Sequence, residues 1–454
     1  MSGVSGEGGV RLHWFSPLPP ARSGIADYTA ELLPFLSSQA EIVLWTDQEK
    51  WDRRVEAHAQ VRRFRADELS WRDILSRDCG AEIPLYHIGN NGPLHHAIWN
   101  VSRRLPGISV LHDSRLQHLF VHIFRDASAH PEGYVDLMSR MYGADGGSAA
   151  RTFLSGGFST EHMAERYPLA SAGAQGSLMS VVHSSESAAI LRNEGFRHAF
   201  HLAFPYASVG EEPERSAGPP FRIVLCGYIG PNRRVDAFFR ALATFPQRDA
   251  FRVDVYGPVW DPEYVRQLIA QGGLSSIVSL HGFVPYRELD DRLRGAHLAV
   301  NLRFPTMGEA SMSQLQLWDH GIVSLVSPVG WYAEAPEDTV LYVRPDHESD
   351  DIHRHLAAFR NDPRRYYRFG DRGREIVRTM HAPDRYVRTL IEIARAASGF
   401  AVRRAAVDTA RRLGSDLARW CSPMCAGLIA ERLASATSCL FDGSFAARRS
   451  ADDR

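Results

Sequence analysis

The chain has 454 residues, about three times the size of one ordinary domain, so we expect two or three domains with separate hydrophobic cores. Its 52 basic and 53 acidic side chains leave a net charge of −1, which argues against a nucleic-acid partner. The one lysine, Lys50, lies in a polar stretch. A phosphate-binding loop ending in Gly-Lys-Ser/Thr is therefore excluded, and pyridoxal or Schiff-base chemistry is disfavoured.

The first half of the chain alternates short apolar runs with helical patterns, as parallel α/β domains do. Residues 1–9 are rich in glycine and serine and lack the apolar stretch of a signal peptide, so we expect a disordered tail. An N-terminal domain over 10–207 follows, with helices expected at Ile25–Ser37, Ser114–Arg125 and Ser185–Asn193. Its expected strands are Val10–Phe15, Glu41–Thr46, Ile83–Ile88, Ile108–His112, Met179–His183 and His201–Pro205.

A polar segment rich in glycine and proline, 208–220, is typical of a linker. The alternation resumes over 221–384 and predicts a second α/β domain. Two parallel sheets that face each other leave a cleft beyond the carboxyl ends of their strands, where ligands bind. The second domain's expected strands are Phe221–Cys226, Phe251–Tyr256, Ile277–His281, His297–Leu302, Ile322–Val326 and Val340–Val343.

Residues 385–440 have a helical pattern, followed by an expected disordered tail at 441–454. In Val402–Trp420, apolar residues recur at helical spacing opposite arginines and two aspartates. Such a helix either packs on the first domain or lies on an anionic membrane; we favour packing, because the aspartates weaken attraction to lipid. Cys421 and Cys425 lack a second metal-binding pair and are expected to be free thiols. With no apolar run of about 18 residues, we expect a cytoplasmic protein with at most peripheral membrane contact.

Two loops at strand ends of the first domain carry polar groups. Ser23-Gly24 lies where a Pro-rich loop enters a helix, so its N–H groups could hold an anion, although such a loop is often only a turn. His112 and Asp113 follow another strand. The histidine could bond a substrate hydroxyl or transfer a proton, or it could simply pair with the aspartate.

A third loop contains Asn90 and is followed by His95 and His96 at the start of a helix. Adjacent histidines raise the possibility of a metal site. No carboxylate or cysteine stands at ligand spacing, and neither His-Glu-x-x-His nor Asp-x-Asp occurs, so we expect no metal.

The second domain offers two loops suited to phosphate. Arg233 and Arg234 stand at an expected helix start, where the helix dipole repels cations, so an anionic ligand would explain them. Glu309 precedes another helix, beside the N–H groups of Ala310, Ser311 and Met312, which could hold a diphosphate. The alternative is that Glu309 only caps that helix.

Taken in this order, the loops resemble those of the family-four retaining glycosyltransferases, over about Arg11 to Ala396. That resemblance implies the GT-B fold: two Rossmann-like α/β domains facing each other across a cleft, here with C-terminal helices. Ser23-Gly24 stands in the place of the family's Gly-Gly loop, and His112 matches its donor-site histidine. The implied acceptor-side residues are Ser23, Gly24, Asn90 and Asp113.

In the second domain, Gly227 matches the family's Gly-Arg-x4-Lys-Gly motif, while Tyr228 replaces its arginine and Arg233 its lysine. Gly282-Phe283-Val284 matches the segment that holds the nucleobase. The resemblance implies catalytic roles for His112, Arg233 and Glu309, and donor-binding roles for Gly227, Tyr228, Arg234, Phe283, Val284, Ala310, Ser311, Met312 and Gln316.

The family's Glu-x7-Glu signature is only half present. Glu309 matches the first glutamate, which faces the sugar and the diphosphate. The second, which binds the ribose hydroxyls, falls on Leu317 by strict spacing and on Gln316 when counted back from Gly321. Gln316 can still bond a diol, but less strongly than a carboxylate.

The resemblance implies transfer of a glycosyl group from a GDP- or UDP-linked sugar to a small-molecule, lipid or glycan acceptor, with retention and without a metal or other cofactor. Arg233 and helix N-termini would neutralise the leaving diphosphate. One alternative, kept open by Tyr228 and Gln316, is a protein that binds nucleotide or glycan without turnover, or that assists a partner enzyme. Another is a GT-B epimerase acting on nucleotide sugars, which would need more carboxylates beside the sugar than Glu309.

Overall fold

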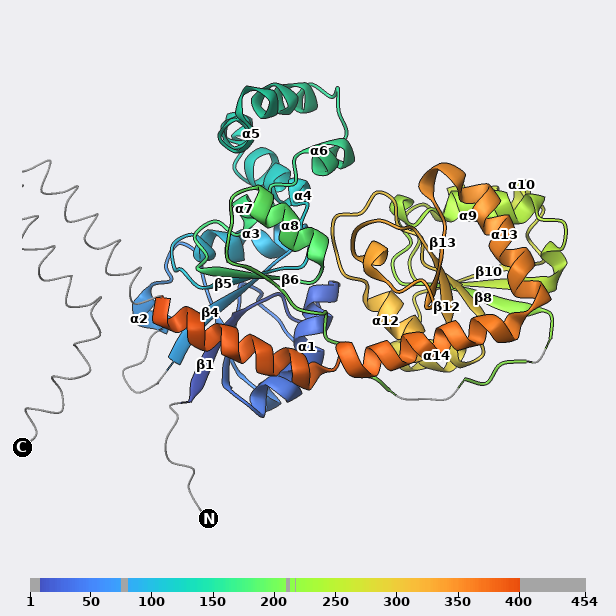
Figure 1. The fold of residues 1–454 in the computed structure, drawn as a ribbon. Coiled ribbons are helices and arrows are strands. Elements are labelled where there is room, and N and C mark those ends of the chain that lie inside the picture. The colour runs from blue at the N-terminus through green and yellow to red at the C-terminus, as the bar shows by residue number, and fades with distance from the viewer. Residues whose placement is uncertain (1–8, 75–80, 210–212, 217, 401–454) are drawn as a thin grey trace, which may run out of the picture.

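A computed structural model describes residues 9–74, 81–209, 213–216 and 218–400. The expected tails, the amphipathic helix Val402–Trp420 and the thiols of Cys421 and Cys425 lie outside these residues. Two α/β domains lie side by side and are joined by a long C-terminal helical segment that crosses from the second domain to the first (Figure 1). Within the described residues, no helix combines the length and the apolar character needed to cross a bilayer.

The first domain is built on a parallel sheet in the order β3-β2-β1-β4-β5-β6-β7. Most of its strands are short apolar runs buried on both faces, as expected for a parallel sheet covered by helices. The strands are β1 (Val10–Phe15), β2 (Glu41–Thr46), β3 (Gln60–Arg63), β4 (Ala81–Ile88), β5 (Ile108–Leu111), β6 (Met179–Val182) and β7 (Ala199–His201).

Helices cover both faces of this sheet, and α5 and α6 extend away from it, at the top of Figure 1. They are α1 (Gly24–Ser37), α2 (Trp71–Ile74), α3 (Gly92–Ser102), α4 (Gln117–Val121), α5 (Pro131–Leu154), α6 (Thr160–Arg166), α7 (Ala170–Gly173) and α8 (Ser185–Asn193), with short turns η1 (Arg53–Ala57) and η2 (His122–Ala127).

Three sequence-based expectations for this domain were wrong. β3 was missed because it is a polar edge strand without an apolar run. The last strand is Ala199–His201 rather than His201–Pro205, because Phe204 packs into the core beyond the end of the ladder. The expected helix Ser114–Arg125 starts only at Gln117 and continues as a π-helical turn, and the N–H groups of Ser114 and Arg115 before it donate to Met307 of the second domain.

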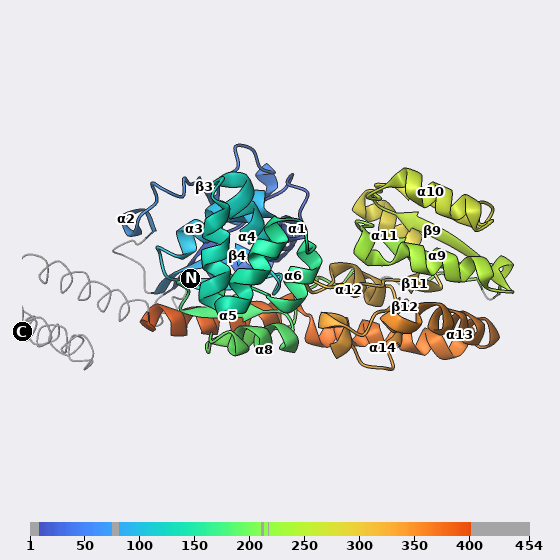
Figure 2. The same ribbon diagram turned by 90° about the horizontal axis from the view of Figure 1, so that it is seen from above.

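The second domain repeats the plan, with a parallel sheet in the order β10-β9-β8-β11-β12-β13. Its strands are β8 (Phe221–Cys226), β9 (Phe251–Tyr256), β10 (Val278–Gly282), β11 (Leu298–Val300), β12 (Val323–Val326) and β13 (Val340–Tyr342). Its helices are α9 (Val235–Thr244), α10 (Pro262–Gln271), α11 (Tyr286–Arg294), α12 (Met312–Asp319), α13 (Glu348–Asn361) and α14 (Pro363–Met380), with turns η3 (Pro231–Arg233), η4 (Arg248–Ala250), η5 (Gly330–Glu334) and η6 (Pro345–His347). Figure 2 shows the two domains as separate layered units.

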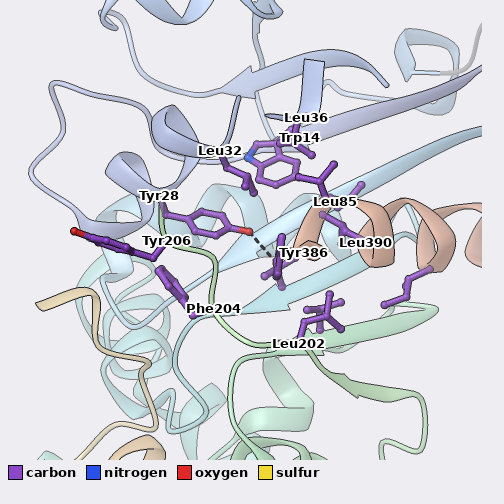
Figure 3. Close-up of a cluster of buried hydrophobic side chains, with 14 of the residues drawn as sticks. Trp14, Tyr28, Leu32, Leu36, Leu85, Leu202, Phe204, Tyr206, Tyr386 and Leu390 are labelled. Carbon is purple, nitrogen blue, oxygen red and sulfur yellow. Dashed lines mark hydrogen bonds between the residues drawn. The ribbon is translucent and has the colours of Figure 1, made fainter. Parts of the chain in front are cut away.

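After α14 the chain returns to the first domain as a helix over residues 383–400. Tyr386 and Leu390 from this helix lie in one buried cluster with Trp14 and Tyr28 (Figure 3). The hydroxyls of Tyr28 and Tyr386 are hydrogen-bonded at 2.9 Å, which satisfies two polar groups inside an otherwise apolar cluster. The helix is thereby fixed to the first domain and ties the two domains together.

Candidate functional site

Both sheets reverse their strand order at one point, between β1 and β4 in the first domain and between β8 and β11 in the second. In open α/β sheets, the crevice at this switch point, beyond the carboxyl ends of the strands, is where ligands bind. Four of the loops singled out in the sequence follow these four strands. The two switch points therefore bring together loops that are far apart in the chain.

Loops from the two domains line one cavity of about 260 Å³. From the first domain it takes the start of α1 and the ends of β4 and β5, and from the second the loop before α12. It thus unites the predicted acceptor-side residues with His112 and part of the predicted donor site. The lining residues are Ser23, Gly24, Ile25, Asn90, Asn91, His95, His112, Asp113, Phe204, Glu309, Ala310 and Met312.

Helix α1 begins at the edge of this cavity. Ser23 is its N-cap, with an extended backbone and a hydroxyl that accepts from the N–H group of Ile25 at 3.2 Å. No atom lies within 4 Å of where a Gly24 side chain would begin, so the cavity reaches the backbone there. The helix N-terminus offers N–H groups and a positive dipole end to a ligand.

His112 follows β5 and is almost completely buried. Its Nε2 lies 2.9 Å from Nδ1 of His87, whose own Nε2 is buried without a partner among the described residues. A proton on that Nε2 would be an unsatisfied buried donor, so His87 carries its proton on Nδ1 and donates to His112. Burial holds the pKa of His112 well below its ordinary value, and His87 and His183 lower it further. His112 is therefore neutral and carries its proton on Nδ1.

Asp113 and Asn90 brace each other at the cavity wall. Asp113 Oδ2 accepts from the N–H group of Asn90 at 2.7 Å, and the Asn90 amide donates to the carbonyl oxygen of Arg115 at 2.6 Å. The pKa of Asp113 is raised to about 7, first by burial and then by the nearby carboxylate of Glu309. The side-chain amide of Asn90 is thus used within the protein, while two carboxyl groups, one from each domain, meet at the cavity.

Glu309 is held by its own loop and is not the cap of α12. One oxygen accepts from the Thr306 hydroxyl at 3.0 Å and from the Met307 N–H group at 2.8 Å, and the other pairs with Arg303 at 2.8 Å. The cap of α12 is Ser311, whose hydroxyl accepts from Gln314. The carboxylate of Glu309 is therefore fixed at the cavity wall, beside the start of α12.

The two neighbouring arginines have different environments. Arg233 is 3% exposed and donates to the carbonyl oxygen of Cys226 at 2.9 Å, close to Arg303 and Glu309. Burial lowers the pKa of its guanidinium, and Arg303 lowers it further. Arg234 adopts a left-handed backbone and forms a bidentate ion pair with Glu348 at 2.6 and 2.7 Å. The charge of Arg234 is balanced within the protein, whereas Arg233 contacts no carboxylate at ion-pair distance in the described part of the chain.

The carboxyl ends of β8, β9 and β10 form a floor without side chains. Gly227, Gly257 and Gly282 follow or end these strands, and all three have positive φ. A Cβ on Gly257 would lie 1.9 Å from the Gly227 carbonyl oxygen, so only glycine allows this approach. Beside this floor Tyr228 and Phe283 are 65% and 78% exposed, which leaves both rings free to stack on a planar ligand.

Gln316 does not point freely into the cleft. It is buried in α12 and donates to Asp290 Oδ1 at 3.1 Å, which also lies 2.9 Å from Nε2 of His320. Leu317, the other candidate for the second glutamate, lies in the apolar cluster with Val284. A carboxylate is thus present beside Gln316, but it comes from α11.

The loop that carries Glu309 also joins the two domains. The Met307 carbonyl oxygen accepts from the N–H groups of Ser114 and Arg115, both at 3.0 Å. A Cβ on Gly308 would lie 1.9 Å from the Ser114 hydroxyl oxygen, so the contact is tight. These contacts hold the two domains together beside the cavity.

A second contact between the domains is made by Glu334. Its carboxylate accepts from the N–H groups of Ser185 and Glu186, at 2.7 and 3.1 Å, and so caps the start of α8 from the other domain.

We expect Glu334→Ala to shift the protein toward an open arrangement by about 1–2 kcal/mol, a factor of about 5–30 in the equilibrium. Small-angle X-ray scattering should show a larger radius of gyration. Glu337→Ala, an exposed glutamate nearby, is the matched control, and equal radii for the two variants would contradict the prediction.

The cavity therefore gathers Ser23, Gly24, Asn90, His112, Asp113, Glu309, Ala310 and Met312, while Ser311 caps α12. The other predicted residues, Gly227, Tyr228, Arg233, Arg234, Phe283, Val284 and Gln316, do not line it. Sequence reasoning missed Gly257, Asp290, Arg303 and the inward position of His95. For Gly257, its position directly after β9 was a signal that could have indicated a role at the end of the sheet. Among the described residues, no group of three or more His, Cys, Asp or Glu is arranged to hold a metal ion.

No protein-family model and no curated protein matches the sequence. Solved structures match it in fold over most of its length. Sucrose-phosphate synthase from Thermosynechococcus elongatus has 14% identity and a TM-score of 0.58, with 85% of this chain and 98% of that chain covered. Anabaena HepE in complex with UDP and glucose has 11% identity and a TM-score of 0.58, with 84% and 98% covered. WaaG, a glycosyltransferase of lipopolysaccharide biosynthesis, has 11% identity and a TM-score of 0.53, with 83% and 98% covered. At such identities the likeness shows the fold alone: the chain has the GT-B fold, with two Rossmann-like domains, as the sequence predicted.

Proposed function

We propose that the protein is a glycosyltransferase of the family-four type, which transfers a glycosyl group from a GDP- or UDP-linked sugar with retention and without a metal ion. The observation that carries this proposal is the cavity, where loops from both switch points meet around the fixed carboxylate of Glu309. Anabaena HepE, which shares the fold, adds support, because its crystal structure was solved in complex with UDP-glucose. The acceptor, a small molecule, lipid or glycan, approaches from the first-domain side.

In such a transfer, different residues contact the base, the diphosphate and the sugar of the donor. The base stacks near Tyr228 and Phe283, and the diphosphate lies over the glycine floor, toward Arg233 and the start of α12. As the bond from the anomeric carbon to the phosphate oxygen breaks, negative charge grows on that oxygen. The charge of Arg233 and the N–H groups of α12 stabilise it. Glu309 faces the positive charge that develops on the sugar ring.

Attack on the face that the leaving group vacates keeps the anomeric configuration. The acceptor oxygen forms the new bond, and its proton passes to the departing phosphate oxygen, so no protein base is required. His112 is unsuited to the role of base, because its pKa is well below its ordinary value and its Nε2 is already bonded to His87. Its Nδ1 proton is suited to donate to a sugar oxygen.

A thermal-shift screen with UDP, GDP, ADP and TDP tests the nucleotide site. A ligand that binds only the folded state raises the free energy of unfolding by mass action, by about 2.7 kcal/mol at a concentration of 100 times its Kd, and so raises Tm. We expect UDP or GDP to raise Tm most. Release of nucleoside diphosphate from the matching sugar donor, without acceptor, then separates an enzyme from a protein that only binds. A flat screen with all four nucleotides would refute the proposal.

A further inference from the structure

The imidazole of His95 is buried beside the cavity. This residue of α3 is 1% exposed, and its Nδ1 lies 3.0 Å from the carbonyl oxygen of His87. A carbonyl oxygen only accepts, so the His95 proton is on Nδ1. Its Nε2 therefore carries a lone pair, and it has no hydrogen-bond partner among the described residues. Burial lowers the pKa of His95 to about 4, so the ring stays neutral at physiological pH.

The ring that carries this lone pair forms part of the inner wall of the cavity. His95 is one of the lining residues, and so is Asp113. A Cβ placed on Gly89 would lie 2.6 Å from Ile25 Cδ1, 3.1 Å from Asp113 Oδ2 and 3.2 Å from His95 Nε2. The unpaired His95 Nε2 and the Asp113 carboxyl group thus lie beside a residue that has no side chain, with the Ile25 methyl group next to them.

The cavity is therefore polarised. Its second-domain side has the start of α12, and α1 begins at its edge, so N–H groups and positive dipole ends favour an anion there. Its inner wall has the unpaired acceptor of His95, which needs a ligand with a hydroxyl or another N–H or O–H donor. A ligand with an anionic part at one end and a hydroxylated ring at the other satisfies both. Buried acceptors of this kind reject a ligand that lacks the matching donor.

We propose that His95 Nε2 accepts a hydrogen bond from a hydroxyl group of the donor's glycosyl ring, which makes His95 a specificity-determining residue of this cavity. The inference rests on the proposed function. It adds His95, from α3, to the residues proposed to contact the sugar, which are His112 and Glu309.

The test compares nucleotides with their sugar conjugates. Thermal shifts are measured with UDP, GDP, ADP and TDP, and with UDP-glucose, GDP-mannose, ADP-glucose and TDP-glucose. His95→Phe keeps the ring shape and removes the lone pair, whereas His95→Gln can return an amide oxygen to this place. Both lose the bond to the His87 carbonyl oxygen, so they differ chiefly in the proposed contact. His96→Phe, the next residue on the same helix, is the matched control.

We expect the wild type to gain more Tm from the sugar conjugate than from the nucleotide alone. In His95→Phe this extra gain should disappear while the shift with the nucleotide alone remains, and His95→Gln should restore part of it. A full extra gain in His95→Phe, or no extra gain in the wild type, overturns the inference and leaves the nucleotide site standing. The absence of any shift with all eight probes overturns the proposed function as well.

Discussion

Replacing Arg233 with methionine should lower glycosyl transfer by about 10²–10³-fold and leave the thermal stability of the unliganded protein unchanged or higher. The guanidinium is 3% exposed, and burial and Arg303 both lower its pKa. The unliganded site therefore disfavours this charge, and a neutral side chain of similar length relieves the conflict. A bound diphosphate makes the charge favourable, so stability and activity should move in different directions.

The adjacent arginine is the matched contrast. Arg234→Met leaves the Glu348 carboxylate without its bidentate partner, so Tm should fall, while turnover should fall much less than in Arg233→Met. Differential scanning fluorimetry and initial rates with the donor found in the nucleotide screen measure both quantities. A marked loss of Tm in Arg233→Met, or equal turnover in Arg233→Met and the wild type, would contradict the role assigned to Arg233.

Arg233→Lys separates charge from shape. Lysine keeps the cation but loses the planar fork that binds two phosphate oxygens at once. Since the chain has a single lysine, its arginines reflect a general preference, and we expect the variant to retain substantial activity. A loss as large as that of Arg233→Met would instead mean that the fork itself is required.

The strands could be predicted where burial on both faces requires a continuous run of apolar residues. β1, β2, β8 and β9 have the bounds expected from the sequence. β3 could not be found, because an edge strand with a polar exposed surface has no such signal. The late start of α4 could not be found either, because the segment before it is held by contacts with Met307, in the other domain.

The loops that line the cavity could be predicted because they follow the carboxyl ends of parallel strands, which a sequence reveals as residues that follow apolar runs. The partners of those residues could not. Gln316 donates to Asp290, 26 residues away in the sequence, and Arg234 donates to Glu348, 114 residues away. Such pairings decide which of two adjacent arginines has a charge left for a ligand, and only the fold reveals them.

The first domain should be sensitive to acid, because it buries a group of neutral histidines. Burial lowers the pKa of His95 and His183 to about 4 and holds the pKa of His87 and His112 well below its ordinary value. At these four side chains the unfolded chain binds protons below about pH 6.5, whereas the folded domain does not until near pH 4 or below. The contribution of these neutral histidines to the free energy of unfolding is therefore complete above pH 6.5. It is lost as the pH falls below that value, by about 1.4 kcal/mol per pH unit for each histidine.

Four such groups amount to about 8 kcal/mol between pH 6.5 and pH 5. The carboxyl groups of Asp113 and Glu31, whose pKa is raised by burial to about 7, take up protons in the folded domain over this range and offset about half of that loss. The remaining loss of about 4 kcal/mol is a large share of the stability of an ordinary domain. We expect urea midpoints to fall steeply over this range, and hydrogen exchange to show the first domain opening before the second. His183→Asn keeps a donor for the Leu202 carbonyl oxygen, to which His183 Nδ1 lies at 3.2 Å, but it cannot take up a proton. It should therefore flatten the pH dependence by about 1.4 kcal/mol per pH unit. His58→Asn, at an exposed position, should leave the slope unchanged. Parallel curves for His183→Asn and the wild type would show that the buried imidazoles do not set the acid limit of this fold.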